Sequence, residues 1–232
     1  MSGKASDEDL ALLGEHALRY VESGFTVGIG TGKAASAFIR ALGHSELKIR
    51  AVPTSERSAE LARRVGIELR PLEGELNVAL DGADEVDANL DLIKGFGGAL
   101  LREKIVAAAA RYYVILVGEE KLVRRLGQRG SLPVEVLAFG VDLCARRIEA
   151  LGMRPQVRRA ENSQEFLTDN GNLILDCAVE EIVEPARLER ELAAIPGVLG
   201  SGLFVGAADE VLVCAAGGKI SSLKRQGTKA KA

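Results

Sequence analysis

Short apolar runs alternate with amphipathic segments along the first half of the chain. The apolar runs have the length and β-branched content of buried strands, and the segments between them have helical periodicity. The runs predict strands at 25–29, 48–52, 67–69, 77–80 and 112–117. Helices are predicted at 7–21, 34–42, 56–65 and 99–110. This alternation is typical of an α/β fold in which an open, mostly parallel sheet is covered by helices on both faces, a three-layer Rossmann-like arrangement.

The order of the predicted elements changes near Gly127, Gly130 and Pro133. Beyond them the pattern predicts a strand at 134–137, a helix at 141–151, a strand at 154–159, strands around the turn Asn170-Gly171, a helix at 185–195 and a strand at 203–205. This β-α-β-β-α-β order is the split βαβ arrangement of a ferredoxin-like α+β domain.

The apolar run 210–215 predicts a strand that returns to the first sheet, which makes the first domain discontinuous. We therefore expect a Rossmann-like catalytic domain at 1–130 and 207–232, and a smaller α+β domain at 131–206. The polar and basic residues 221–232 predict a frayed tail.

Composition narrows the classes of partner. The 33 acidic and 30 basic residues give a net charge of −3, and aromatic residues make up only 4%, which argues against nucleic-acid binding. Three widely spaced cysteines, Cys144, Cys177 and Cys214, have no metal-ligand spacing and indicate free thiols in a reducing compartment. Neither a signal peptide nor a run of membrane-spanning length is present, so we expect a cytoplasmic protein with no membrane partner.

A glycine-rich turn follows the first predicted strand. The sequence Gly28-Ile29-Gly30-Thr31-Gly32-Lys33 leads directly into a helical segment, and backbone amides at such a helix start attract phosphate groups. The turn lacks the first glycine and the hydroxyl residue of a P-loop, and its third glycine comes one residue early for a dinucleotide fingerprint. ATP and NAD are therefore not expected, and a tight turn without a ligand is the alternative.

An acidic stretch follows the predicted strand at 77–80. Asp81 and Asp84 lie at the carboxyl end of that strand, the edge at which open α/β sheets bind ligands. The glycines at 95, 97 and 98 lead to a helix with Leu101, Ile105 and Ala108 on one side, and Glu103 is expected to point back toward the Asp81 loop. The acidic spacing lacks the order of an EF-hand, so no metal site is expected; an ordinary solvated loop is the other alternative.

Six segments together resemble the type A ribose-5-phosphate isomerases. They are VGIGTG at 27–32, VPTS at 52–55, DGADEVD at 81–87, IKGFGGALLREKIVA at 93–107, LPVEV at 132–136 and TDNGNLILD at 168–176. The resemblance covers nearly the whole chain, and the segments occur in the family's order. It implies interconversion of ribose 5-phosphate and ribulose 5-phosphate through an enediolate, in the non-oxidative pentose phosphate pathway, with no cofactor or metal. It also implies a homodimer or homotetramer.

The resemblance also implies roles for individual residues. Glu103 matches the general base, and Asp81, Asp84 and Lys94 match the other catalytic residues. A carboxylate removes a proton from carbon only where the developing oxyanion is stabilised, which Lys94 or loop amides would provide. The implied substrate-binding residues are Thr31, Gly32, Lys33, Ala34, Asp81, Gly82, Ala83, Asp84, Lys94, Gly95, Phe96, Gly97 and Lys121.

The chain departs from the family pattern in its phosphate turn. Lys33-Ala34 stands where the family usually has Ser-Thr, a lysine usual in the first helix is absent near Leu10, and Phe96 replaces a usual glycine. We therefore predict that Lys33 binds the phosphate in place of the missing groups. The alternative is a lysine that faces solvent.

Two other functions fit the same fold less well. Phosphosugar deaminases and lactonases generally depend on histidine, but His16 and His44 lie away from the candidate loops. A sugar-phosphate-binding sensor without turnover would not need Glu103 together with Lys94, and a DNA-reading helix pair would be expected beside it.

Overall fold

The computed structural model describes residues 4–225, and the chain divides into two compact units. The first unit joins the residues up to Ala83, Arg102–Leu122 and the residues from Gly206 onward. The second unit joins Asp84–Leu101 with Val123–Val205. Residues 84–101 and 123–130 thus group with the smaller unit, whereas the sequence boundary was expected near residue 130. The expected division into a domain at 1–130 and 207–232 and a smaller domain at 131–206 stays a prediction.

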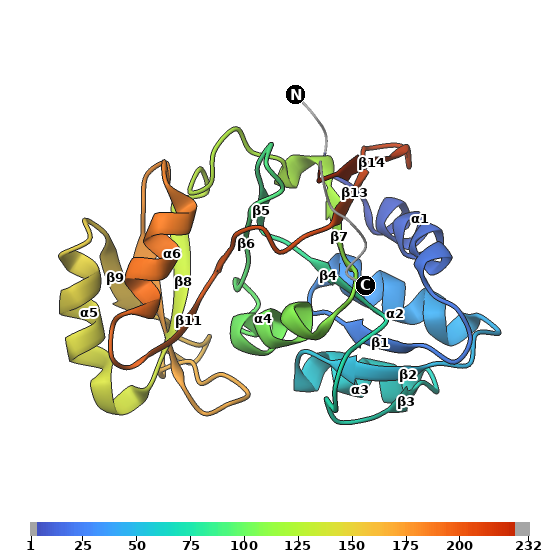
Figure 1. Cartoon of the computed structure of the whole chain (residues 1–232), viewed down its shortest axis with the longest axis horizontal. Coiled ribbons are helices and arrows are strands. Elements are labelled where there is room, and N and C mark those ends of the chain that lie inside the picture. The colour runs from blue at the N-terminus through green and yellow to red at the C-terminus, as the bar shows by residue number, and fades with distance from the viewer. Residues whose placement is uncertain (1–3, 226–232) are drawn as a thin grey trace. The chain divides into compact units, whose positions relative to one another are not determined.

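A seven-stranded sheet forms the centre of the first unit, in the order β14-β13-β7-β4-β1-β2-β3 (Figure 1). All of its pairings are parallel except that of β14 with β13. The strands are β1 (Thr26–Ile29), β2 (Arg50–Pro53), β3 (Glu68–Leu69), β4 (Val78–Gly82), β7 (Tyr113–Gly118), β13 (Glu210–Cys214) and β14 (Ile220–Lys224). The expected open, mostly parallel α/β sheet is confirmed.

Helices of the first unit cover both faces of this sheet. They are α1 (Asp7–Ala17), η1 (Leu18–Tyr20), α2 (Lys33–His44), α3 (Glu56–Arg64), α4 (Leu100–Ala109, from Arg102 on) and η2 (Glu119–Lys121). Val27 and Ile29 belong to the same core as Phe38 of α2, while Gly28 between them faces Val106 of α4. Because successive strand residues point to opposite faces, α2 and α4 lie on opposite sides of the sheet.

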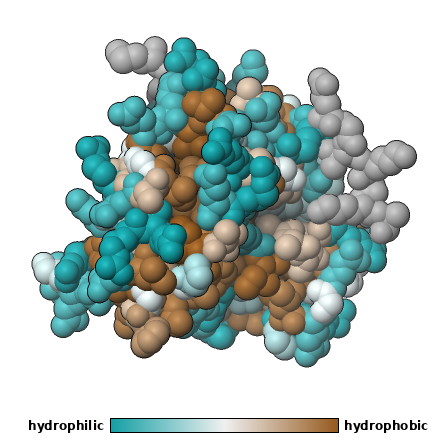
Figure 2. Space-filling view, turned by 60° about the vertical axis from the view of Figure 1, so that its left-hand side comes forward, coloured by the Kyte–Doolittle hydropathy of each residue, from teal (hydrophilic) through white to brown (hydrophobic). Residues whose placement is uncertain are grey.

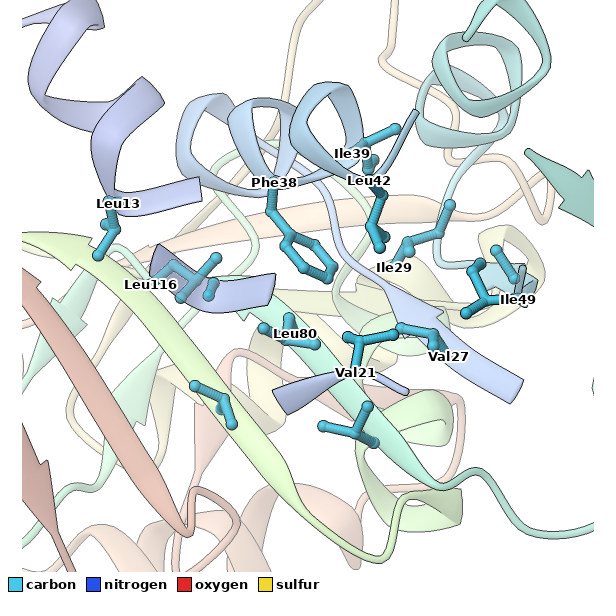
Figure 3. Close-up of a cluster of buried hydrophobic side chains, with 14 of the residues drawn as sticks. Leu13, Val21, Val27, Ile29, Phe38, Ile39, Leu42, Ile49, Leu80 and Leu116 are labelled. Carbon is cyan, nitrogen blue, oxygen red and sulfur yellow. The ribbon is translucent and has the colours of Figure 1, made fainter. Parts of the chain in front are cut away.

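The main core of the first unit lies between the sheet and the α1–α2 layer. Phe38 points from α2 toward the strands, where Leu80 and Leu116 are buried beside it (Figure 3). Two capping boxes fix helix starts: Ser6 accepts from the Asp9 amide, and Ser55 accepts from the Ser58 amide. Ser6 and Ser55 are thus the N-caps of α1 and α3.

A four-stranded antiparallel sheet forms the centre of the second unit, in the order β11-β8-β10-β9. Its elements are β8 (Ser131–Val136), η3 (Ala138–Gly140), α5 (Val141–Glu149), β9 (Arg154–Val157), β10 (Leu173–Ala178), α6 (Pro185–Ala193) and β11 (Val198–Ser201). Their succession, β-α-β-β-α-β, is the split βαβ arrangement expected from the sequence.

The second unit also contains a small sheet that the sequence pattern did not predict. It has the order β12-β6-β5, with β5 (Glu85–Val86), β6 (Leu92–Ile93) and β12 (Leu203–Phe204). The expected closing strand at 203–205 is therefore wrong in part, because β11 closes the larger sheet and β12 pairs with β6. Strands of two residues are too short to show a period.

Three further expectations need correction. Ile105 is 48% exposed, and the buried side of α4 instead contains Leu100, Glu103 and Val106. Residues 220–224 form β14 rather than a frayed tail, and residues 226–232 lie outside the described part of the chain. Before the Asn170-Gly171 turn only an isolated bridge, Leu167 to Leu173, pairs with β10. Within residues 4–225 no helix is both long and apolar enough to cross a membrane.

Candidate active site

Asp81 lies at the carboxyl end of β4 with only 1% of its surface exposed. Its Oδ1 accepts the backbone N–H of Thr31 at 2.9 Å and of Gly82 at 2.7 Å. Gly30 passes so close that a Cβ there would lie 2.0 Å from the same oxygen. Only glycine therefore leaves room for the carboxylate, and two amides orient it.

Glu103 lies in the first turn of α4 and is 4% exposed. An acidic side chain at this position is favoured by the helix dipole. The helix covers the face of the sheet to which Gly28 points, and Asp81 lies on that same face because residues 79 and 81 alternate with the core residue Leu80. The sheet and α4 thus bring Asp81 and Glu103 to one side of the first unit.

A buried tyrosine, Tyr113, lies beside Asp81 and is influenced by the charge of Glu103. Tyr113 begins β7, and its hydroxyl lies 3.5 Å from Asp81 Oδ2, a long contact for a hydrogen bond. Burial raises the pKa of Tyr113 well above its ordinary value, and the negative charges of Asp81 and Glu103 raise it further. The phenol therefore stays protonated beside the two acids, and sequence reasoning missed it because the residue looked like an ordinary strand position.

The glycine-rich turn after β1 has the strand-turn-helix geometry that the sequence predicted. β1 ends at Ile29, Gly32 has φ 112°, and α2 begins at Lys33 with no side chain of the described residues capping its first amides. Thr31 Oγ1 lies 2.8 Å from Thr54 Oγ1 and donates to Ser55 Oγ at 2.7 Å. Thr54 and Ser55 directly follow β2, which puts them at the same edge of the sheet.

Lys33 projects from the start of α2 into solvent. Its side chain is 74% exposed, and Nζ lies 3.6 Å from Asp7 Oδ1, which is itself largely exposed. Ala34 is half-buried beside it, and Lys121 ends the short helix η2 after β7. The strands β1, β4 and β7 are parallel, so their carboxyl ends lie at one edge of the sheet. At that edge lie the turn at 31–34 after β1, the segment 81–83 at the end of β4, and Lys121 after β7.

Asp84 and Lys94 lie on the small sheet of the second unit. β5 and β6 pair with Glu85 opposite Ile93, so the register places Asp84 opposite Lys94. The Asp84 N–H donates to the Ile93 carbonyl at 2.8 Å. Lys94 is 2% exposed, and its Nζ lies 5.6 Å from the centre of the Phe204 ring.

The loop from Gly95 to Gly98 continues from Lys94. Gly95 and Gly98 have φ values of 106° and 82°, which glycine adopts without strain. The Phe96 N–H donates to Asp84 Oδ2 at 2.9 Å, while the Phe96 side chain is 41% exposed. Gly97 is exposed as well. The structure thus brings Asp84, Lys94 and the glycine loop together within the second unit.

Comparison with known proteins identifies the family. Residues 50–218 match the family of ribose 5-phosphate isomerase A (phosphoriboisomerase A). A ribose-5-phosphate isomerase A of Roseiflexus sp. (strain RS-1) is 51% identical over 207 residues, which are 86% of this chain and 88% of that protein. The corresponding protein of Natronomonas pharaonis is 48% identical over 205 residues, 86% of this chain and 90% of its own length.

Solved structures agree with these relatives. A ribose 5-phosphate isomerase A from Methanocaldococcus jannaschii superimposes with a TM-score of 0.89 at 38% identity, covering 94% of this chain and 100% of its own. A D-ribose-5-phosphate isomerase in complex with phospho-erythronic acid has a TM-score of 0.90 at 36% identity, covering 94% of this chain and 98% of its own. The fold, the order of the motifs and these matches show that the chain belongs to the ribose-5-phosphate isomerase A family.

Proposed function

We propose that this chain interconverts D-ribose 5-phosphate and D-ribulose 5-phosphate with Glu103 as the base that moves a proton between C1 and C2. The observation that carries the proposal is the buried group of Asp81, Glu103 and Tyr113, found in a member of this family. Burial keeps the carboxylate of Glu103 away from bulk water, so it is poorly solvated and is a stronger base toward a C–H bond.

The reaction needs an acceptor for the negative charge that develops on the substrate. Removal of the C2 proton from open-chain ribose 5-phosphate leaves an enediolate, and return of a proton to C1 gives the ketose. We assign Lys94 to the enediolate oxygen, because a buried ammonium group stabilises an oxyanion more strongly than a solvated one does. Asp81 and Asp84 are assigned to sugar hydroxyls and to the proton transfers of ring opening.

The phosphate is assigned to the start of α2. The amides after Gly32 point along the helix axis, and no side chain of the described residues caps them. Thr31, Ala34 and Lys121 complete this part of the proposal, because each follows a strand at the same edge of the first unit. Gly82 and Ala83 continue the Asp81 loop, and Gly95, Phe96 and Gly97 are assigned to substrate contact beside Lys94, with the Phe96 N–H already donating to Asp84 Oδ2.

The ligand of one structural neighbour supports this assignment. That isomerase was solved with phospho-erythronic acid. A phosphorylated aldonic acid combines a phosphate with a planar, negatively charged carboxylate, which resembles an enediolate in shape and charge. We infer that the same compound binds this chain, because transition-state and intermediate analogues bind more tightly than substrates.

Proton NMR in deuterated water tests the function directly. Folded protein with ribose 5-phosphate is expected to form ribulose 5-phosphate and to introduce deuterium at the carbon next to the carbonyl. The rate is expected to be unchanged after chelation of metal ions, since every assigned group belongs to the protein, and phospho-erythronic acid should inhibit. Binding of the sugar phosphate with neither interconversion nor exchange would instead indicate a sensor.

Assembly and location complete the proposal. We propose a homodimer or homotetramer in the cytoplasm, on the family resemblance. Figure 2 shows apolar residues interspersed with hydrophilic ones on one face, and in the second unit Leu137 and Phe139 are 46% and 97% exposed. Apolar exposure of this degree supports a contact with another chain. Light scattering coupled to size-exclusion chromatography tests the state of assembly.

A further inference from the structure

The side chain of Arg158 donates four hydrogen bonds, to three residues of the second unit. It follows β9, and its side chain is 12% exposed. Nε and Nη2 donate to the two carboxylate oxygens of Asp176 at 2.8 and 2.5 Å. Nη1 donates to the carbonyls of Gly95 at 2.9 Å and Phe96 at 3.2 Å. One edge of the guanidinium is thus bound to β10, and the other nitrogen is bound to the glycine loop.

The backbone around Arg158 is itself anchored. Its N–H donates to the Ile174 carbonyl at 2.8 Å, and its carbonyl accepts from the Phe166 N–H at 2.9 Å. The Phe166 ring lies under the guanidinium, with 5.7 Å between the ring centre and Cζ of Arg158. A planar cation held by an ion pair, by backbone bonds on both sides and by a ring has little freedom to move.

The loop that Arg158 binds depends on such anchors. Gly95 and Gly98 have positive φ, so this segment does not continue the strand β6. The Phe166 ring also packs on Gly98, where an added Cβ would lie 2.5 Å from Cζ of the ring. Arg158 holds the carbonyls of residues 95 and 96, and Phe166 holds residue 98.

This anchoring extends to a proposed catalytic residue. The Phe96 N–H, next to the two bound carbonyls, donates to Asp84 Oδ2 at 2.9 Å. A rotation of the peptide between Gly95 and Phe96 would move both the Gly95 carbonyl and the Phe96 N–H, because they belong to the same planar unit. The bond from Arg158 to the Gly95 carbonyl therefore fixes the direction of the N–H that orients Asp84.

We propose that Arg158 is a positioning residue for the isomerase reaction, holding the Gly95–Phe96 peptide so that its amide orients the Asp84 carboxylate. The inference rests on the proposed function, since Asp84 acts only if the chain turns over pentose phosphate. An arginine is required because a lysine ammonium reaches either Asp176 or the loop carbonyls but lacks the planar fork that binds both at once.

The first experiment compares Arg158→Lys with Arg159→Lys. The neighbouring Arg159 is exposed, and its Nη1 donates to the Ser163 carbonyl at 3.3 Å, so it receives the same chemical change away from the loop. Arg158→Lys is expected to lower kcat with ribose 5-phosphate at least tenfold with KM changed less than threefold, and Arg159→Lys to leave both within twofold. Equal kcat values for Arg158→Lys and the unsubstituted protein would overturn the inference.

A double-mutant cycle with Asp84→Asn separates positioning from simple stabilisation. If Arg158 acts through Asp84, Arg158→Lys lowers kcat far less in the Asp84→Asn background than in the unsubstituted protein. An equal loss in both backgrounds would show a purely structural role and overturn the inference. If circular dichroism shows that Arg158→Lys does not fold, Phe166→Leu is tested in its place, because it removes the ring that packs on Gly98 of the loop. The same changes in kcat are expected for it.

The controls also distinguish failure of this inference from failure of the proposed function. Absence of turnover in both the unsubstituted protein and Arg159→Lys would reject the function itself, and with it the role of Arg158. Turnover in both, with no selective loss in Arg158→Lys, would reject only the positioning role.

Discussion

At the scale of single residues, the burial of Glu103, the one acidic residue of α4, distinguishes it from a surface glutamate. It is 4% exposed, and its charge raises the pKa of the buried Tyr113. A surface glutamate on α4 would be solvated and weakly basic toward carbon. The position of Glu103 on the buried side of the helix therefore suits its carboxylate to the proposed role of base.

We expect Glu103→Gln to lower kcat at least about a hundredfold with little change in KM, because removal of a positioned base acts on the transition state. Steady-state kinetics with ribose 5-phosphate measures the loss. Glu60→Gln is the matched control, since Glu60 is an exposed residue of α3 whose carboxylate forms a surface ion pair with Arg64. Near-normal turnover in Glu103→Gln would remove this residue from the mechanism and make Asp81 the next candidate.

A second prediction concerns Lys33, which stands where the family usually has serine. Its side chain is exposed beside Asp7, so its attraction to a phosphate is screened by water and salt. We expect Lys33→Ala to raise KM severalfold at low ionic strength, with kcat little changed and a smaller effect at high salt. Lys48→Ala, at an exposed position before β2, should change neither constant. An unaltered KM at low salt would leave the phosphate to the backbone amides and Lys121.

At the scale of elements, the turns after β1 and β2 act together. The Thr31 hydroxyl donates to Ser55, and Ser55 also accepts from the Ser58 amide as the cap of α3. One serine thus stabilises a helix and holds a proposed substrate-binding residue. The capping contact with Ser58 is local to the start of α3, whereas the contact with Thr31 joins two turns that are 24 residues apart.

Ser55→Ala and Ser6→Ala form a matched pair that separates these roles. Both remove the acceptor of a capping box, so each should lower the free energy of unfolding by about 1 kcal/mol. Only Ser55→Ala releases the Thr31 hydroxyl, and only it should raise KM for ribose 5-phosphate. Urea denaturation and kinetics test the pair. The same KM in both variants would show that Thr31 needs no support from Ser55.

At the scale of the whole molecule, β13 and β14 bring the chain back to the sheet of the first unit after the second unit. A polar cluster around Glu210 connects them to earlier parts of that unit. Glu210 of β13 is 2% exposed; it accepts from Tyr112 at 2.8 Å and from Ser222 of β14. Burial by itself would raise the pKa of Glu210, but hydrogen bonds from Ser222, Tyr20 and Tyr112 outweigh it and lower the pKa. The cluster joins β13, β14, η1 and Tyr112, the residue before β7, so residues distant in sequence are held by one carboxylate.

This lowered pKa predicts how stability depends on pH. A carboxyl group with a lower pKa in the folded state stabilises the protein above its unfolded pKa of about 4.3, and this contribution is lost as the pH falls through the folded pKa. Glu210→Gln should therefore be less stable than the unsubstituted protein near pH 7, by about 1–2 kcal/mol. The difference should shrink below about pH 4. Urea denaturation at several pH values measures it, and a constant difference would contradict the assignment.

Much of the candidate site was predictable from the sequence because its residues follow strands. Asp81 comes at the end of an apolar run, and the glycines around Thr31 lead from a strand to a helix. Parallel strands place such positions at one edge of a sheet whatever the loops contain. Composition, strand and helix periodicity, and the order of six segments that resemble the family's motifs were therefore enough for the fold class and for the family.

Other features were decided by tertiary structure alone. Tyr113 reaches Asp81 because β7 pairs with β4, and Arg158 reaches Gly95 across 63 residues. The sheet of β5, β6 and β12 consists of strands too short to show a period, yet its register places Asp84 opposite Lys94. A periodic pattern reports which face of one element is buried, whereas the partners of a buried polar group depend on which elements meet, and that is fixed only when the chain folds.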